Sequence, residues 1–172
     1  AQNSTISDSI ASGEVGLEFT FDTTKLAGKD TVVFETLKYK DKEIANHRNI
    51  NDDNQTLRHP EIKTQAHSVE SGTNTGAPSK EEKIIDKVKY KNLIIGKKYK
   101  VTGVLMDKDK NKPILDKDDK EITAEKEFTA ENADGEIELE FRYDSSLRQN
   151  KVTVVFETLT YRNVPVAVHA DI

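Results

Sequence analysis

The sequence contains no cysteine, no long apolar run and no excess of basic residues. Without cysteine, disulfides, thiolate metal sites and cysteine nucleophiles are excluded together. No apolar run approaches the length of a membrane span, so we expect no membrane insertion in this segment. The 26 lysines and arginines are outnumbered by 31 acidic residues. No basic surface is left for phosphates, and nucleic acid is not an expected partner.

An internal repeat organises the 172 residues. Residues 13–50 align with residues 135–172 without a gap, at a constant offset of 122 positions (135 − 13 = 122), and nearly half of the positions are identical. We expect two units: residues 1–57, the C-terminal portion of one repeat, and residues 58–172, a second repeat that lacks its last strand. The boundary falls near His59-Pro60. The start, Ala1-Gln2-Asn3, resembles neither a signal peptide nor an initiator methionine, so we expect a segment of a longer protein.

Apolar and polar residues alternate with a period of two in several segments, which predicts half-buried strands. The pattern runs through residues 15–21, 84–91, 99–105 and 137–143. Residues 71–82 are rich in Ser, Gly, Thr and Asn, which indicates a loop. Residues 107–111 begin like a calcium loop but lack its glycine and distal glutamate, so we expect a charged turn and no metal. These patterns predict an all-β fold, a β-sandwich with little or no helix.

Polar side chains interrupt the apolar faces of the predicted strands. One hydroxyl, two acids and a histidine take inward positions in the second unit: Thr64, Asp86, Glu157 and His169. Glu35 and His47 are the matching residues of the first unit. Burial of such groups costs free energy unless they are paired, and desolvation raises the pKa of a carboxyl group. Each residue alone is most simply a hydrogen-bonded core residue, but together they are the groups that activate a weak nucleophile.

Several motifs of the chain occur in a characteristic order. They are the run Ile84-Ile-Asp-Lys-Val-Lys-Tyr-Lys-Asn-Leu93, the run Gly96-Lys-Lys-Tyr-Lys-Val-Thr-Gly-Val-Leu-Met-Asp107, Val-Val-Phe-Glu ending at Glu35 and again at Glu157, and the segment from His47 to Gln55-Thr56. In this order the motifs resemble the Thr–Gln ester-bond domains of Gram-positive surface adhesins. The resemblance covers nearly the whole chain.

This resemblance implies immunoglobulin-like (CnaB-like) modules in tandem, in which a Thr on the first strand is esterified to a Gln on the last. The implied nucleophile is Thr64, assisted by Asp86, Glu157 and His169. In the first unit the matching residues are Glu35, His47 and the acyl partner Gln55. Thr64 and Gln55 fall in different units, so an ester would need another chain, a domain swap or a separate Gln-bearing strand. The implied reaction is a single autocatalytic turnover that requires no cofactor, so the protein is not an enzyme in the usual sense.

We therefore expect an extracellular, cell-wall-anchored stalk segment whose partners are neighbouring repeats and, in addition, a Gln-bearing strand or second chain. Three alternatives remain. A stalk domain with a Lys–Asn isopeptide needs a lysine on an apolar face, and none stands out. A ligand-binding adhesin domain needs an exposed apolar or aromatic patch, and aromatic residues are only 6% of the chain. A conventional hydrolase needs a nucleophile elbow or a Gly-rich oxyanion loop, and neither is present.

Overall fold

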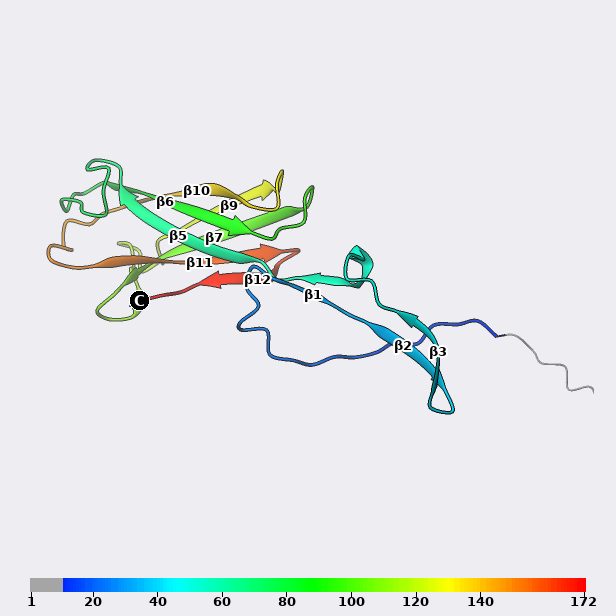
Figure 1. Cartoon of the computed structure of the whole chain (residues 1–172). Coiled ribbons are helices and arrows are strands. Elements are labelled where there is room, and N and C mark those ends of the chain that lie inside the picture. Colours follow the sequence, from blue (N-terminus) through cyan, green and yellow to red (C-terminus); the bar gives the residue numbers. More distant parts are fainter. Residues whose placement is uncertain (1–10) are drawn as a thin grey trace, which may run out of the picture.

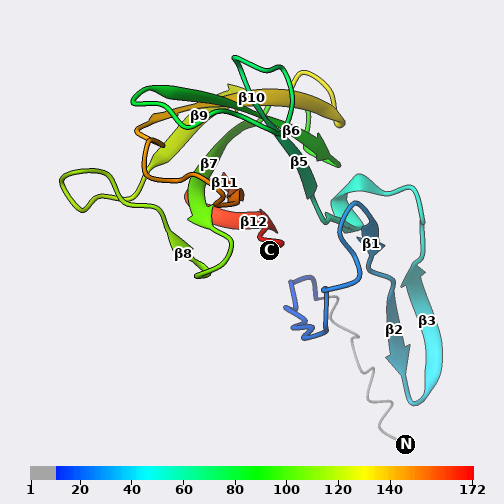
Figure 2. The ribbon, with the colours of Figure 1, turned by 90° about the vertical axis from the view of Figure 1, so that its left-hand side faces the viewer.

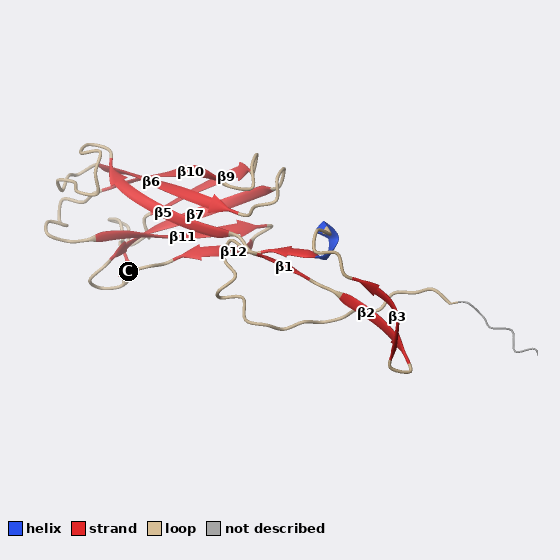
Figure 3. Cartoon of the chain, in the orientation of Figure 1, coloured by secondary structure: helices blue, strands red, loops and turns tan. Residues whose placement is uncertain are grey.

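The computed structural model describes residues 11–172, and β-strands account for almost all of its regular structure (Figures 1 and 3). The only helix among these residues is η1, a 3-10 turn at Asp53–Gln55. The predicted all-β fold is confirmed. No helix within residues 11–172 is long and apolar enough to cross a membrane. The first ten residues of the expected unit 1–57 lie outside the described range.

Two antiparallel sheets form the larger body of the molecule. One sheet has the order β10-β6-β5, and the other has the order β12-β11-β7, with β8 and β9 both paired to the far edge of β7. Figure 2 shows these strands in layers, beside a separate arm. The strands of this body are β5 (Glu61–Ser68), β6 (Glu82–Lys91), β7 (Lys98–Asp107), β8 (Lys112–Pro113), β9 (Thr123–Thr129), β10 (Gly135–Tyr143), β11 (Thr153–Tyr161) and β12 (Val164–His169).

The hydrophobic core lies within this body. Its most buried side chains come from alternate positions of β6, β7, β10 and β11, and they include Val88, Val101, Leu105, Leu139, Phe141 and Leu159. Burial of a side chain of this size contributes about 1.5–3 kcal/mol. The strands predicted over residues 84–91, 99–105 and 137–143 are therefore present, as are the loop before β6 and the turn between β7 and β8.

The first unit forms two small ribbons that extend away from the sandwich as an arm (Figure 1). β1 (Asp30–Val32) pairs with β4 (Thr56–Arg58), and β2 (Glu35–Tyr39) pairs with β3 (Lys42–His47). All buried apolar residues of the described chain lie between Ile62 and Leu159. The arm therefore has no hydrophobic core of its own.

The β2–β3 and β11–β12 hairpins are built alike, as the sequence repeat requires. In each, the glutamate of Val-Val-Phe-Glu is the cross-strand partner of the histidine, and a register shift follows two residues after the glutamate. Each hairpin turns through two residues with positive φ, Lys40-Asp41 and Arg162-Asn163. Two consecutive positive φ angles define a type I′ turn, whose twist matches that of the flanking strands.

The strand predicted over residues 15–21 is absent. These residues form no strand, and their apolar side chains are exposed, from 89% for Val15 to 47% for Phe21. Their repeat counterpart is β10, which pairs with β6 along its whole length. No described residue of the first unit provides a strand equivalent to β6. An alternating sequence becomes a stable strand only where a neighbour pairs its backbone and covers its apolar face.

Candidate functional site

The four residues predicted for the second unit come from four strands and meet between the two sheets. Thr64 on β5 and Asp86 on β6 belong to one sheet. Glu157 on β11 and His169 at the end of β12 belong to the other. β5 and β12 lie in contact at the edges of their sheets, but no ladder joins them among the described residues. The site is therefore at an open edge of the sandwich.

His169 connects the hydroxyl group to an acid. Its Nδ1 atom lies 3.2 Å from Thr64 Oγ1 and 3.0 Å from Glu157 Oε2. Cross-strand pairing of Glu157 with His169 fixes this approach from the backbone. The His169 side chain is 25% exposed, whereas that of Glu157 is fully buried. The hydroxyl and the imidazole can therefore be reached from the groove, and the acid cannot.

Asp86 and Glu157 form a buried acid pair. Both residues are completely inaccessible to solvent, and the two carboxyl groups are close enough for each to affect the pKa of the other. Desolvation, followed by the proximity of Asp86, raises the pKa of Glu157 to about 10, and desolvation also raises the pKa of Asp86. Neither oxygen of Asp86 nor Oε1 of Glu157 has a hydrogen-bond partner among the described residues. A proton on one carboxyl group is thus the donor that this pair requires at neutral pH.

The protonated pair sets the role of His169. A single ring nitrogen carries either a hydrogen or a lone pair, so Nδ1 cannot donate to Glu157 and accept from Thr64 at once. If the proton of Glu157 lies on Oε2, this carboxyl group donates to Nδ1, whose lone pair then also faces the Thr64 hydroxyl hydrogen. Nε2 then carries the ring hydrogen, and it faces Asp171 Oδ2 at 3.6 Å. In this state the imidazole can accept the proton of Thr64.

Gly103 contributes to the site and was not predicted from the sequence. It lies on β7 directly opposite Glu157. A Cβ atom at this position would lie 2.7 Å from Phe141 Cζ and 2.9 Å from Leu139 Cδ1, which come from the facing sheet. Leu139 is the cross-strand partner of Asp86. The glycine therefore lets the two sheets approach closely where the acids meet. A glycine within an alternating strand was the available signal.

An open groove leads to Thr64 and His169. It has a volume of about 730 Å³ and runs between β5 and β12. Its walls include the first four residues of β5 and the last four residues of β12. At one end it is bounded by Arg58, His59 and the first-unit residues Thr23 and Ala27. The groove thus follows two unpaired strand edges, each of which presents free backbone groups.

The residues predicted for the first unit form a separate cluster. The Gln55 side-chain amide donates to Glu35 Oε2 and, at 3.3 Å, to the main-chain oxygen of His47. The carboxamide oxygen of Gln55, Oε1, is buried and accepts no hydrogen bond. His47 is 57% exposed and lies 2.8 Å from Asp52 Oδ2. The expectation that His47 faces a core is therefore wrong, because no second sheet covers this hairpin.

The two clusters are not joined. Among residues 11–172 no hydrogen bond or ion pair connects Gln55 with Thr64. In the same range, no group of three or more His, Asp or Glu side chains could hold a metal ion.

Comparison with known proteins relates this geometry to a family. The model of the T-Q ester bond containing domain matches the chain twice, over residues 1–59 and 60–172. A comparison with curated proteins gave no match. Two crystal forms of an adhesin from Mobiluncus mulieris, described as containing intramolecular disulfide, isopeptide and ester bond cross-links, have TM-scores of 0.47 and 0.49 at 17% identity.

These alignments cover 66% of the present chain and 53% of the adhesin chain, so the chain spans about half the length of that structure. The family match extends over the whole sequence, in two copies. The resemblance seen in the sequence motifs is confirmed, and the chain belongs to the family of T-Q ester bond containing domains.

Proposed function

We propose that the second unit is a self-cross-linking module, in which Thr64 forms an ester with a Gln on a strand that follows β12 and pairs with the free edge at the start of β11. The observation that carries the proposal is the contact of Thr64 Oγ1 with His169 Nδ1 at 3.2 Å, beside a fully buried acid pair. A threonine hydroxyl is a weak nucleophile at neutral pH, and an adjacent base is the usual means of activating it.

The proposed reaction proceeds in two steps. His169 takes the Thr64 proton as Oγ1 attacks the carboxamide carbon of the Gln, which gives a tetrahedral intermediate. Nitrogen then takes a proton and leaves as ammonia. A hydroxyl and a carboxamide thus become one ester and one ammonia. Because nucleophile, base and acids are held on packed strands, proximity supplies much of the acceleration.

The acid pair is suited to polarise the carboxamide. A carboxyl group that remains protonated at neutral pH can donate to the oxygen on which negative charge develops. The first unit supports this role indirectly. There, Gln55 Oε1 is buried without a donor, and no described residue of that unit corresponds to Asp86. The donor that Gln55 lacks is the one that Asp86 and Glu157 would provide.

The repeat indicates where such a Gln would lie. Glu35 and His47 have the same register as Glu157 and His169. Gln55 follows His47 after a short connection, and its amide contacts Glu35. A strand like Asn51–Arg58 that followed β12 with the same geometry would therefore bring its Gln to Glu157, next to Thr64.

The arrangement favours an ester over a Lys–Asn isopeptide. No lysine of residues 11–172 is buried. The isopeptide reaction requires an uncharged amine, and burial is the main means of lowering the pKa of a lysine. The nucleophile candidate of this unit is instead the hydroxyl group of the half-buried Thr64.

We further propose that the two units, 1–57 and 58–172, are consecutive repeats of an extracellular stalk displayed on a bacterial cell wall. Membership of an ester-bond family and the tandem arrangement support this role. An ester that joins the first and last strands would limit unfolding under load much as a disulfide does, without a need for cysteine. The partners are neighbouring repeats and a Gln-bearing strand.

The test is a version of the chain in which a copy of the Asn51–Arg58 sequence follows Ile172. Ile50 and Ile172 are equivalent in the repeat, so the added segment is in register. We expect its intact mass to be lower by one ammonia than its sequence requires. Thr64→Ala should retain the full mass and the same circular dichroism spectrum. Loss of ammonia from that variant would mean that another residue is the nucleophile.

A further inference from the structure

The first unit meets the sandwich at two places, and the first is the covalent linker between β4 and β5. His59 in this linker donates its N–H to the carbonyl of Lys29 at 3.0 Å and accepts from the N–H of Gly28 at 2.7 Å. His59 Nε2 also lies 2.8 Å from Thr31 Oγ1. The next residue, Pro60, fixes its own φ and restricts His59 to extended conformations. Hydrogen bonds to the first unit therefore restrain the conformation of the linker.

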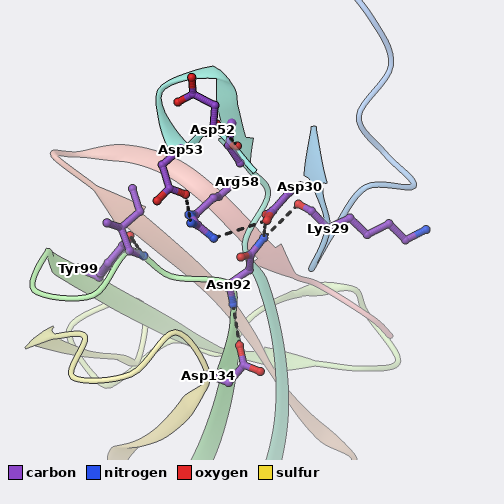
Figure 4. A network of polar contacts seen from close by, with 10 residues as sticks. Lys29, Asp30, Asp52, Asp53, Arg58, Asn92, Tyr99 and Asp134 are labelled. Carbon is purple, nitrogen blue, oxygen red and sulfur yellow. Dashed lines mark hydrogen bonds and ion pairs between the residues drawn. The ribbon is translucent and has the colours of Figure 1, made fainter. Parts of the chain in front are cut away.

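The second place is the turn between β6 and β7, which contacts first-unit residues more than sixty positions earlier in the sequence (Figure 4). Here the side-chain amide of Asn92 donates to the Lys29 carbonyl at 3.1 Å and to Asp30 Oδ1 at 2.6 Å. Both amide hydrogens are thus used on the first unit. The backbone N–H of Asn92 donates to Asp134 Oδ1 at 3.0 Å, so the sandwich holds this residue in place.

Asp30 links this contact to the arm. It faces Arg58 across the β1–β4 ladder, and its second carboxylate oxygen lies 3.5 Å from the Arg58 guanidinium. Arg58 also contacts Asp53 Oδ1 at 3.0 Å. A chain of polar contacts therefore runs from the sandwich through Asn92 and Asp30 to β4 and η1. Hydrogen bonds to a charged group are stronger than those between neutral groups.

The repeat shows that the strand itself does not require an acid at position 30. The equivalent residue in the second unit is Val152 (30 + 122 = 152), which directly precedes β11. Valine is therefore accepted at this position of the repeat. An aspartate stands only in the copy that faces Asn92, which indicates that its carboxylate serves the contact between the units.

We propose that Asn92 and Asp30 form a docking contact that fixes the angle between consecutive repeats. A single covalent linker would leave the arm free to rotate about its backbone dihedrals. A second attachment removes that freedom, because rotation about the linker would break the Asn92 bonds. The partner that this surface recognises is the Lys29–Asp30 corner of the preceding repeat, and the resulting joint makes the tandem array stiff. This proposal does not depend on ester formation.

Absence of cysteine makes a distance measurement direct, because two introduced cysteines are the only sites that a spin label can modify. Leu57 on β4 and Glu138 on β10 are exposed and lie on the two sides of the joint. Labels at Leu57→Cys and Glu138→Cys in the full chain should give one narrow distance distribution by pulsed electron spin resonance. Asn92→Gly and, separately, Asp30→Val should each at least double its width.

Asn111→Gly is the matched control. Asn111 also has a positive φ, but it lies in the β7–β8 turn and makes none of the contacts to the first unit. Its replacement should leave the distribution narrow. Hydrogen exchange of β5–β11 should be unchanged in all three variants, which shows that the sandwich remains folded. A broad distribution in the unaltered chain would overturn the proposal. Equal widths in all chains, or equal broadening by Asn111→Gly, would also overturn it.

Discussion

At the scale of single residues, the site depends on carboxyl groups that are placed where water cannot reach them. Glu157 and Asp86 are fully buried, and they face each other from different sheets. Two adjacent carboxylates cannot both ionise in such a place without a large cost in free energy. In the proposed reaction, the proton that they retain leaves the Nδ1 lone pair of His169 available to Thr64.

This arrangement predicts a pH dependence of stability. The raised pKa of Glu157 means that the folded protein retains a proton that the unfolded chain releases above the ordinary pKa of a glutamate. The contribution of Glu157 to stability should therefore be largest below about pH 5 and should be lost progressively as the pH rises to about 10. A loss of about 1 kcal/mol lowers Tm by about 2–4 °C in a protein of this size. Thermal unfolding across this range measures the slope.

Glu157→Gln should flatten that slope, because glutamine has the same shape and does not titrate. Glu138→Gln, at an exposed position of β10, is the matched control and should leave the slope unchanged. The groups with a lowered pKa, such as Asp107 and Asp116, lose their stabilising effect only at lower pH. An unchanged slope in Glu157→Gln would show that Glu157 is ionised in the folded protein.

Gly103→Ala should destabilise the second unit by about 1–3 kcal/mol, since the added methyl group overlaps Phe141 and Leu139. Urea unfolding gives this difference. The same variant should slow ester formation, because it separates the sheets that carry the two acids. Gly16→Ala is the control, since nothing lies within 4 Å of a Cβ atom there. Equal stability of Gly103→Ala and the unaltered chain would contradict the packing described for this position.

Sequence reasoning identified Thr64, Asp86, Glu157 and His169 because each interrupts an apolar face. Their proximity required pairing between distant strands, and only the family resemblance indicated it. Gly103 and Asn92 were not identified. The signal for Gly103 was weak, and that for Asn92 was absent, because a contact to a residue more than sixty positions away leaves no local pattern.

At the scale of elements, the β11–β12 hairpin positions His169 opposite Glu157. Its turn places Arg162 and Asn163 at positive φ, which most residues adopt only with strain. Asn163→Gly should be neutral or slightly stabilising, whereas Asn163→Val should destabilise by about 1 kcal/mol or more. Urea unfolding measures both. Equal midpoints for the two variants would show that this turn does not hold the hairpin.

The segment 15–21 shows why alternation alone was insufficient. Its sequence closely follows that of β10, yet only β10 is a strand. β6 satisfies the backbone of β10, and the core covers Leu139 and Phe141. Local patterning therefore predicts which face of a strand is apolar, while the presence of the strand depends on neighbours that the pattern does not contain.

At the scale of the whole molecule, burial is concentrated in the second unit, so stability should be unequal along the chain. We expect slow amide hydrogen exchange in β6, β7, β10 and β11 and fast exchange in the β2–β3 hairpin, where Leu37 and Tyr39 are more than half exposed. Hydrogen exchange measured by mass spectrometry gives the exchange rates of the sandwich strands and of the β2–β3 hairpin. If amides of the β2–β3 hairpin exchanged as slowly as those of the β11–β12 hairpin, another surface would have to bury the β2–β3 hairpin in solution.

The fold class and the repeat could be predicted because they depend on periodicity over many residues. The shape of the arm could not, since it depends on which partner strands are present. The candidate site could be predicted only in part. Its residue types were visible in the sequence, but the open groove beside Thr64 depends on the spacing of β5 and β12, which no local pattern specifies.

The most direct test of the proposed chemistry uses the chain as it is, mixed with a peptide of the Asn51–Arg58 sequence. Intact-mass measurement under denaturing conditions should show an adduct that equals the sum of the two masses less one ammonia and that strong base cleaves. Thr64→Ala and His169→Ala should form none. If the peptide binds beside the start of β11, as detected by chemical shift changes, and no adduct appears, then Thr64 is not an ester-forming nucleophile in this site.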